Sequence, residues 1–301
     1  MKHLNKKIKR LHKQMLQILL VLVLIILFLV VAFLTLLHLG FRAPRIVEQI
    51  TPKDLSLDYQ DISILSKNNK KLYGWFLPIN NSQKTIIILH GWGGNIEMML
   101  PIALPFHRAG FNVLLFDSRG HGQSDSDTFS SLPRFSEDLD ASIDWLKSTH
   151  NKASQKIVLL GHSVGAGAVL LSASKRTDID AVISISAFAH GEWMMKRYLS
   201  NIYIPKILIK LILNYVAWLI GIKFAQFAPM NTACKISAPV LIAHGTDDKL
   251  IPVTDAHIIV NNCPAGNLTL LEIAEAGHES IDKFEQHSGE ILKFMIEKIE
   301  D

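Results

Sequence analysis

A serine between two glycines, in the segment Gly161-His162-Ser163-Val164-Gly165, has the clearest chemical meaning in this sequence. Residues 156–160 before it are mostly apolar, as in a short buried strand, and residues 166–175 are small and apolar, as in a helix packed on a sheet. A strand, a sharp turn and a helix hold the serine oxygen out at the end of the sheet, near a helix N-terminus that favours negative charge. This context predicts that Ser163 is a nucleophile. The competing interpretation is a turn without chemistry.

A glycine-rich loop, His90-Gly91-Trp92-Gly93-Gly94, follows an earlier predicted strand at residues 85–89. Such a loop aims backbone N–H groups at a developing oxyanion. Where a serine nucleophile stands in a turn of this kind, one donor follows the serine and the other comes from an earlier loop. We therefore predict that the backbone N–H groups of Trp92 and Val164 form an oxyanion hole. The alternative is a plain connection between a strand and a helix.

An acid and a base are expected after later strands. The predicted strand at residues 239–243 leads into a loop that carries Asp247 and Asp248, and either carboxylate could orient a histidine. Of the 13 histidines, only His278 follows the last predicted strand in a Gly-His turn. A serine attacks a carbonyl carbon when such a histidine takes its proton and a carboxylate holds the imidazole. The predicted base is therefore His278.

The order Ser163, Asp248, His278 is the chain order of α/β-hydrolases, and from about residue 54 onward the chain resembles that superfamily, in particular its serine aminopeptidase-like branch. The segment 116–124 looks like the D-x-R-G-H-G-x-S loop of that branch, which implies that Asp117 and His121 brace the site. Asp248 with Ile251-Pro252 resembles its D-x-x-V-P loop, so the resemblance favours Asp248 over Asp247 as the acid.

The resemblance implies a serine hydrolase that cleaves an ester or thioester through an acyl-enzyme. A peptidase, and a catalytically silent interaction protein that uses the same fold, are the alternatives. The expected partners are an acyl ester or peptide substrate and a membrane. No cofactor or metal is implied, because the sequence has neither ligand clusters with suitable spacing nor a G-x-G-x-x-G loop after a strand.

A long apolar segment near the N-terminus predicts a membrane anchor. Residues 15–37 contain no charged side chain, and about 20 apolar residues suffice to cross a bilayer as a helix. We predict a basic segment at 1–14, a transmembrane signal anchor at 15–39 and a juxtamembrane segment at 40–53. A cleaved signal peptide is the competing interpretation, but its apolar region is normally shorter and ends in a small-residue site.

The distribution of Lys and Arg around this segment predicts its orientation. Basic residues are denser before the span than after it, so the N-terminus is expected in the cytoplasm and the catalytic domain on the other side. The net charge of +4 mostly reflects this basic N-terminus, so no nucleic-acid partner is expected.

The remaining chain, 54–301, is expected to form one α/β domain with a mostly parallel sheet and helices on both faces. The pattern predicts a hairpin at 55–64 and 71–77, then strands near 85–90, 112–117, 156–161, 181–186, 239–244 and 268–273. Helices are predicted near 95–109, 134–149, 164–176, 253–262 and 279–299.

Residues 188–232 interrupt the alternation and are predicted to form a helical cap over the site. The apolar stretch 207–222 could instead be a second membrane span, although Lys210 and Asn214 interrupt it. Four large side chains of this segment either line an acyl pocket or take part in ordinary packing, and the sequence leaves both open: Trp193, Met194, Met195 and Trp218.

The two cysteines, Cys234 and Cys263, are expected to be free, buried thiols. Pairing is the alternative outside the cytoplasm, but a sequence does not give the distance on which a disulfide depends.

Overall fold

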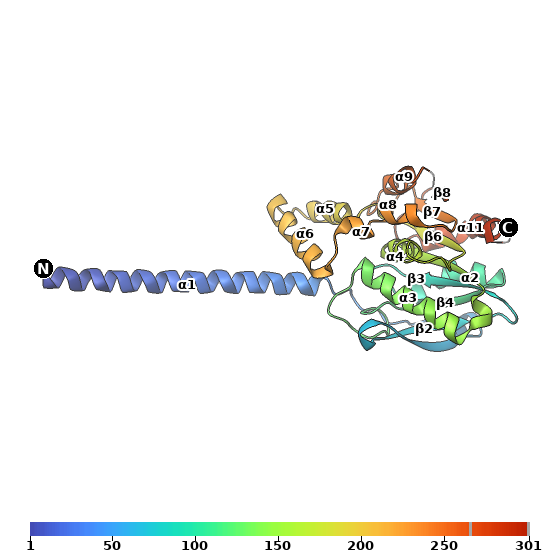
Figure 1. Ribbon diagram of the computed structural model, residues 1–301, viewed down its shortest axis with the longest axis horizontal. Helices are drawn as coiled ribbons and strands as arrows, with labels where there is room; N and C mark the ends of the chain where they lie inside the picture. The colour runs from blue at the N-terminus through green and yellow to red at the C-terminus, as the bar shows by residue number, and fades with distance from the viewer. Residues whose placement is uncertain (265–266, 300–301) are drawn as a thin grey trace. The chain divides into compact units, whose positions relative to one another are not determined.

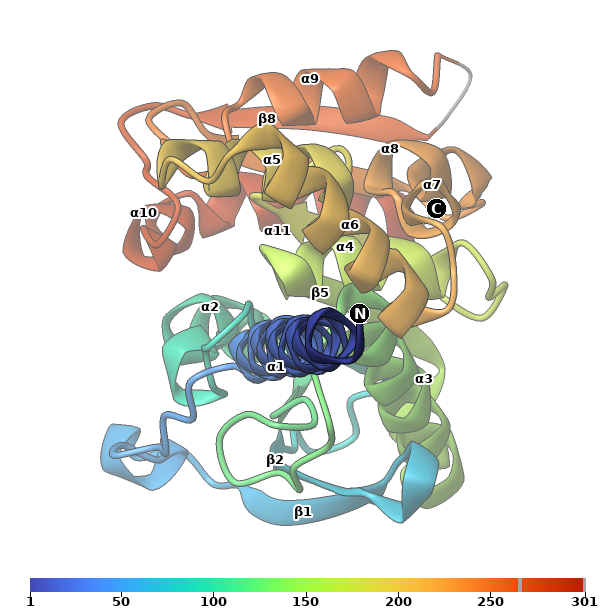
Figure 2. The same ribbon diagram turned by 90° about the vertical axis from the view of Figure 1, so that its left-hand side faces the viewer.

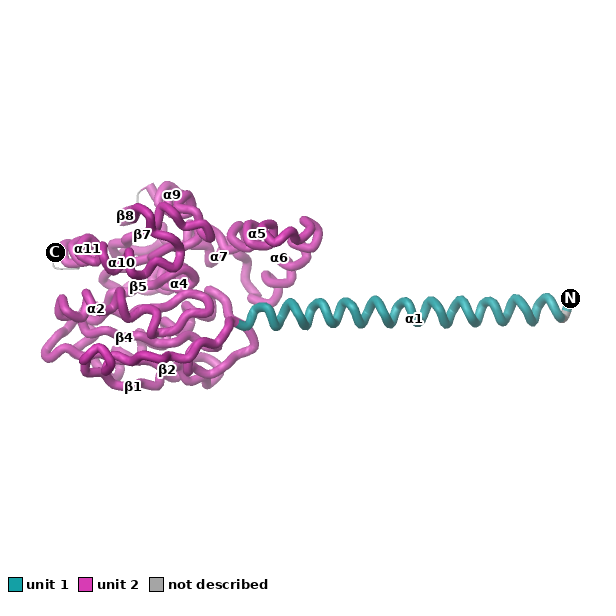
Figure 3. Tube along the Cα trace, turned by 180° about the vertical axis from the view of Figure 1, so that it is seen from behind, with its two compact units in different colours: residues 1–42 teal, residues 43–301 magenta. Residues whose placement is uncertain are grey.

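An eight-stranded sheet forms the centre of residues 43–301, one of the two units into which the chain divides; the other is residues 1–42 (Figure 3). The computed structural model describes residues 1–264 and 267–299. The last two residues of the expected catalytic domain, 300 and 301, lie outside the described residues.

Residues 1–42 consist mainly of one helix, α1 (Lys2–Gly40). It begins at Lys2, before the expected span at 15–39, since the basic residues that precede the apolar stretch are themselves good helix formers. By length and composition the helix can cross a membrane, with a mean hydropathy of 3.5 over its most apolar window.

The sheet has the strand order β1-β2-β4-β3-β5-β6-β7-β8 (Figure 1). Its strands are β1 (Gln60–Leu65), β2 (Lys71–Leu77), β3 (Lys84–Leu89), β4 (Asn112–Phe116), β5 (Lys156–His162), β6 (Ala181–Ile185), β7 (Val240–Gly245) and β8 (Leu268–Ile273). The pairs β1–β2 and β2–β4 are antiparallel, and all other neighbours are parallel. The expected mostly parallel sheet with an edge hairpin is therefore confirmed.

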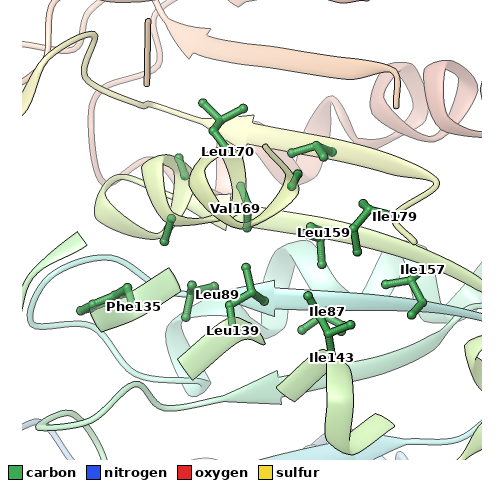
Figure 4. Close-up of a cluster of buried hydrophobic side chains, with 14 of the residues drawn as sticks. Ile87, Leu89, Phe135, Leu139, Ile143, Ile157, Leu159, Val169, Leu170 and Ile179 are labelled. Atoms are coloured by element: carbon green, nitrogen blue, oxygen red, sulfur yellow. The ribbon is translucent and has the colours of Figure 1, made fainter. Parts of the chain in front are cut away.

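Helices cover both faces of the sheet, which explains why β3 and β5 are apolar almost throughout. One face packs against α3 (Leu132–Thr149), α4 (Val164–Ala173) and α9 (Thr254–Asn261), and Figure 4 shows Leu139 and Val169 of these helices in one cluster with Ile87 and Leu159 of the sheet. The other face packs against α2 (Leu100–Arg108), α10 (Ile281–Gln286) and α11 (Ser288–Ile299); Figure 2 shows α2 and α3 on opposite sides.

Some element boundaries differ from the expectation. The predicted helix 279–299 is two helices, α10 and α11, that meet at His287. The first strand begins at Gln60 and not at residue 55, because Pro52–Leu55 form a short 3-10 helix whose start is favoured by Pro52 and by a capping box of Thr51 and Asp54.

Residues 188–232, called the cap insertion below, lie between β6 and β7 and contain α5 (Gly191–Asn201), α6 (Lys206–Ile220), α7 (Phe224–Phe227) and α8 (Pro229–Thr232). The apolar stretch forms α6, which has 15 residues and is too short for the roughly 20 that a span needs. One face of α6 is buried in the protein through Ile209, Ile212, Leu213 and Val216. The stretch is therefore a packed helix of the cap insertion, and a second span is not supported.

The expectation of free thiols is wrong. Cys234 and Cys263 form a disulfide, with their Cα atoms 5.0 Å apart. Cys234 follows α8 and Cys263 follows α9, so the bond joins the segment just after the cap insertion to the end of α9, the helix that follows β7 in the chain. These segments are 29 residues apart in sequence, and only the packing of α8 against α9 brings them within bonding distance.

Candidate active site

Ser163 stands at the apex of the turn between β5 and α4, with φ 56° and ψ −115°. A positive φ is unusual for a residue with a side chain and stores strain that the surroundings must support. The flanking glycines make the turn possible: a Cβ at Gly161 would overlap the Gly165 carbonyl, and a Cβ at Gly165 would overlap the backbone at the end of β3. The sequence thus sets Ser163 at the carboxyl end of the central strand, close to the loop after β3.

The structure brings the three predicted residues into one chain of hydrogen bonds. His278 Nε2 lies 2.9 Å from Ser163 Oγ, and His278 Nδ1 lies 2.7 Å from Asp248 Oδ2. All three are buried, with exposed fractions of 8, 5 and 8% for Ser163, Asp248 and His278. With Nδ1–H donated to the carboxylate, Nε2 is left to accept the serine proton. This is the geometry of a Ser-His-Asp triad.

The neighbouring carboxylate, Asp247, occupies a different position. Its side chain pairs with Thr246 Oγ1 at 3.4 Å, and its N–H donates to the Ala276 carbonyl. Among the described residues, the hydrogen bond to His278 Nδ1 comes from Asp248 and none comes from Asp247. The structure therefore distinguishes the two neighbouring aspartates, because Asp248 and not Asp247 contacts His278.

Several donors converge on Asp248. Its Oδ1 accepts the N–H groups of Leu250 at 2.9 Å and Ile251 at 2.7 Å. Burial by itself would raise the pKa of Asp248, but hydrogen bonds from His244, His278 and the Ile251 N–H outweigh it and hold the pKa well below its usual range. The carboxylate therefore keeps its charge at neutral pH and can orient the imidazole.

Two further histidines hold the loops of the site, a role that sequence reasoning missed. His162 Nε2 donates to the His278 carbonyl at 2.8 Å, and His244 Nε2 donates to the Ile251 carbonyl at 2.8 Å. Burial and the nearby His278 lower the pKa of His162 to about 4, so this ring stays neutral. Each histidine stands at the carboxyl end of its strand, which is the one sequence signal that could have marked them.

The predicted oxyanion donors lie beside the serine. Val164 begins α4 directly after Ser163, and Trp92 lies in the loop after β3. Within residues 1–264 and 267–299, neither backbone N–H has a hydrogen-bond acceptor in the protein. Trp92 and Ser163 both line a cavity of about 70 Å³. Both N–H groups are thus available to an external acceptor.

The cavity beside Ser163 is small. Sites that enclose drug-sized ligands usually measure about 300–1,000 Å³, so this one has room for a reacting carbonyl group and not for a long acyl chain. Its lining comes from the loops after β3, β5 and β8 and from the 3-10 turn Glu97–Met99 just before α2, and no residue of the cap insertion, all of which is described, belongs to it. Trp193 instead stacks on His190, and Trp218 is 75% exposed.

The segment after β4 braces the loops around this cavity, in agreement with the expected role of Asp117. The carboxyl oxygens of Asp117 accept the N–H groups of Ile96 at 3.0 Å and Gln123 at 3.1 Å. His90 Nε2 accepts from the Ser118 N–H, and its Nδ1 donates to the Gly91 carbonyl. Only a neutral imidazole can do both, and burial lowers the pKa of His90 to about 3. His121 packs edge-on against Trp92, with ring centres 6.1 Å apart.

Residues 44–49 of the expected juxtamembrane segment are bound to the same loops. Arg45 Nη1 donates to the Gly122 carbonyl at 3.1 Å, and Asn95 Nδ2 donates to the Ile46 carbonyl at 3.2 Å. A Cβ added at Gly93 would lie 3.0 Å from Pro44 Cγ. The segment is therefore an integral part of the unit formed by residues 43–301 and lies beside the loop after β3, which the sequence did not indicate.

A pair of carboxyl groups, Glu48 and Asp117, joins this segment to the site. Burial, followed by the hydrogen bond and the charge of Glu48, raises the pKa of Asp117 to about 8. A carboxyl with a raised native pKa contributes stability that is complete below its unfolded pKa, near 4, and is lost as the pH rises to the native value. The nearby His90, 4.0 Å from Asp117, stays neutral across this range.

We therefore expect Glu48→Gln to lessen the fall in Tm between about pH 4 and 8, because a glutamine amide can donate to a charged Asp117. The difference in Tm at pH 8 should reach at least about 2–4 °C, which corresponds to 1 kcal/mol in a domain of this size. Differential scanning calorimetry across this range measures it. The exposed Glu297 gives the control Glu297→Gln, whose profile should follow the wild type. Parallel profiles for all three proteins would contradict a shared proton.

Comparison with protein families places these residues in context. The family model described as serine aminopeptidase, S33, matches residues 80–229, about half of the chain, which include Trp92, Ser163 and Val164. Asp248 and His278 lie beyond the matched segment. The yeast (Saccharomyces cerevisiae) protein YNL320W, described as an uncharacterized membrane protein, is 25% identical over 250 residues, 82% of this chain and 83% of its own length. YqkD of Bacillus subtilis is 31% identical over 185 residues, 60% of each chain.

Solved structures show the same architecture. The esterase Pf2001 of Pyrococcus furiosus superposes with a TM-score of 0.71 at 26% identity, over 86% of this chain and 98% of the esterase. Est1E of Butyrivibrio proteoclasticus, solved with ferulic acid bound, superposes with a TM-score of 0.62 over 79% of this chain and 99% of its own. At 21% identity this second likeness concerns the fold alone.

Proposed function

Because the chain belongs to the α/β-hydrolase superfamily, we propose that it is a serine hydrolase that cleaves a carboxylic ester or thioester and is anchored in a membrane by α1. The observation that carries the catalytic part is the hydrogen-bonded chain from Ser163 through His278 to Asp248. In an enzyme with these hydrogen bonds, the fold brings together a nucleophile, a base and a carboxylate that fixes the tautomer of the base.

The roles follow from the geometry. Ser163 Oγ attacks the carbonyl carbon of the substrate while His278 Nε2 takes the hydroxyl proton, and the same proton then passes to the leaving alcohol or thiol. Asp248 stabilises the imidazolium that forms. The N–H groups of Trp92 and Val164 bind the oxyanion, and the loss of one such donor costs about 10²–10³ in kcat in a related arrangement. Water then hydrolyses the acyl-enzyme with His278 as base.

An ester is favoured over a peptide bond. The solved relative with the higher TM-score and identity is an esterase, and the small cavity beside Ser163 has room for a reacting carbonyl group. A peptidase is the second candidate, since the matching family model is described as a serine aminopeptidase. Both candidates use the same serine, so they differ only in the leaving group.

Two assays test the proposal with the full-length protein in detergent. A fluorophosphonate probe reacts only with an activated serine, so it should label the wild type and not Ser163→Ala. A panel of p-nitrophenyl esters beside aminoacyl p-nitroanilides then compares kcat/KM for the two leaving groups. Labelling together with a preference for the amides would replace the esterase proposal by the peptidase, and absence of labelling would favour a catalytically silent protein.

The anchor and its orientation belong to the same proposal. The apolar part of α1 is long enough to span a bilayer, and the basic residues gather on its N-terminal side. The disulfide between Cys234 and Cys263 supports a catalytic domain outside the cytoplasm, since disulfides persist in oxidising compartments. The yeast relative described as a membrane protein supports the anchor.

We expect the two sides of α1 to differ in access to a membrane-impermeant maleimide. Leu4→Cys and Leu65→Cys place single thiols at leucines that are 64 and 65% exposed, on the N-terminal side of the apolar stretch and in the catalytic domain. The native cysteines do not compete, because they are bonded to each other. In intact cells Leu65→Cys should be labelled, and Leu4→Cys should react only after permeabilisation. The reverse pattern would contradict the orientation.

A further inference from the structure

We propose that the exposed face of α6 docks on the surface of the bilayer in which α1 is anchored, with the apolar side chains at the level of the lipid headgroups and three lysines facing anionic lipid. The inference rests on the anchoring part of the proposed function and not on the catalytic part. It concerns a surface of the cap insertion that neither the site nor the fold explains.

The helix α6 has two apolar faces. Its inner face is buried through Ile209, Ile212, Leu213 and Val216. The outer face carries Ile207, Leu211 and Trp218, which are 66, 52 and 75% exposed and spaced at intervals of four and seven residues, so they form one stripe along the helix. Ile222, two residues beyond the end of α6, is also exposed, at 40%. Contiguous exposed apolar surface of this kind marks an interaction site.

The charges and aromatic residues around the stripe fit a lipid surface. Lys206, Lys210 and Lys223 flank it, and residues 206–227 contain no acidic side chain. Within the described part of the chain, none of the three lysines forms an ion pair. Trp218 and the 93% exposed Tyr203 are residue types that concentrate where a membrane meets water. Apolar residues on one side of a helix with lysines beside them are typical of helices that lie in a membrane interface.

The position of α6 in the fold places this stripe at the edge of the sheet that carries the site. The chain enters α5 and α6 from the carboxyl end of β6, which is parallel to β5 and ends at the same edge as Ser163. Figure 1 shows α5 and α6 extending beyond this edge.

The chain itself limits how far this edge can be from the membrane. Pro44 packs beside Gly93 in the loop after β3, and only three residues lie between Pro44 and Gly40, the last residue of α1. The four Cα–Cα steps from Gly40 to Pro44 span at most about 14 Å when the chain is extended. The short connection thus keeps the loop after β3 within reach of the bilayer that α1 spans. An ester group at the headgroup level would then lie close to Ser163.

A fluorescence experiment on the full-length protein in vesicles tests the contact. Leu211→Cys and Leu65→Cys replace leucines of similar exposure, the first on the stripe and the second on β1, and each thiol carries the environment-sensitive label NBD. The vesicles contain phosphatidylcholine and phosphatidylglycerol, with or without nitroxide-labelled phosphatidylcholine. We expect quenching at position 211 to be severalfold greater than at 65. Lys206→Gln with Lys210→Gln in the Leu211→Cys background should weaken docking about fivefold per lysine.

Two other outcomes of this experiment would overturn the proposal. Equal quenching at 211 and 65, or quenching at neither in vesicles that carry the protein on flotation, would overturn the proposal. A blue-shifted label at 211 without quenching would mean that another protein, or a second copy, covers the stripe, and would also overturn it. Ser163→Ala in the Leu211→Cys background should leave quenching unchanged, so a failure of the catalytic proposal stays distinguishable. Vesicles that float without the protein would instead contradict the anchor.

Discussion

Ser163→Ala and His278→Ala should each lower kcat for ester hydrolysis by about 10⁶-fold while leaving the fold intact. The serine oxygen and the imidazole act in one proton transfer, so removal of either stops the same step. Their hydrogen bond of 2.9 Å is already formed in the absence of substrate. The double variant should be no slower than either single variant, because residues that work as a unit do not contribute additively.

The matched control is Ser172→Ala. Ser172 is fully buried in α4, and its hydroxyl donates to Asp140 on α3, away from the cavity. This variant loses one hydrogen bond and about 0.5–1.5 kcal/mol of stability but should hydrolyse esters at the wild-type rate. Initial rates with p-nitrophenyl esters, together with Tm, measure both effects. Near-normal turnover by folded Ser163→Ala protein would remove Ser163 from the mechanism.

The parts of this molecule that could be predicted from sequence are those specified by local patterns. Each parallel strand was predicted to within one residue at both ends, because a buried strand between two helices is a short apolar run with polar residues on either side. The turn at Ser163 was predictable for a similar reason: the glycines at 161 and 165 are needed where the helix and the neighbouring strand approach too closely for a side chain.

Contacts between distant segments could not be predicted in this way. The disulfide depends on α8 packing against α9, and the binding of residues 44–49 to the loops after β3 and β4 depends on where those loops meet. A linker between an anchor and a domain looks polar and irregular in sequence whether it is free or bound. The effect of Glu48 on the pKa of Asp117 could not be predicted, because it depends on the folded position of Glu48 beside this buried carboxyl.

The site itself shows the same division. Ser163 and His278 each follow a strand in a distinctive turn, so their positions were predictable, whereas the cavity volume and the neutral state of His162 arise from packing around them. The cap insertion could be recognised by its interrupted pattern. Its interrupted pattern could not show that the cavity is lined by loops and by no side chain of the cap insertion. Nor could it show that α6 has a second, exposed apolar face, because this depends on how the helix packs against the rest of the protein.

The choice between the two aspartates gives the sharpest contrast within one loop. Asp248→Asn should lower kcat by about 10⁴-fold, whereas Asp247→Asn should cost less than about tenfold. Asp248 Oδ2 accepts the Nδ1 proton of His278 at 2.7 Å, and this bond leaves Nε2 free to take the serine proton. An asparagine amide at 248 can donate to Nδ1 and so favour the tautomer with its proton on Nε2, which cannot act as the base. Asp247 makes no such bond and pairs with Thr246 instead.

The pH dependence separates a tautomer effect from a structural one. Asp248 also accepts the N–H groups of Leu250 and Ile251, so a loss of activity could arise from a loop that no longer holds its shape. If the tautomer is the cause, Asp248→Asn should keep a Tm close to that of Asp247→Asn and should recover part of its rate at high pH, where hydroxide replaces the missing base. Measured rates from pH 6 to 10 on both variants, with Tm alongside, decide between the two causes. Equal losses in both variants would mean that the loop, and not the carboxylate at 248, supports catalysis.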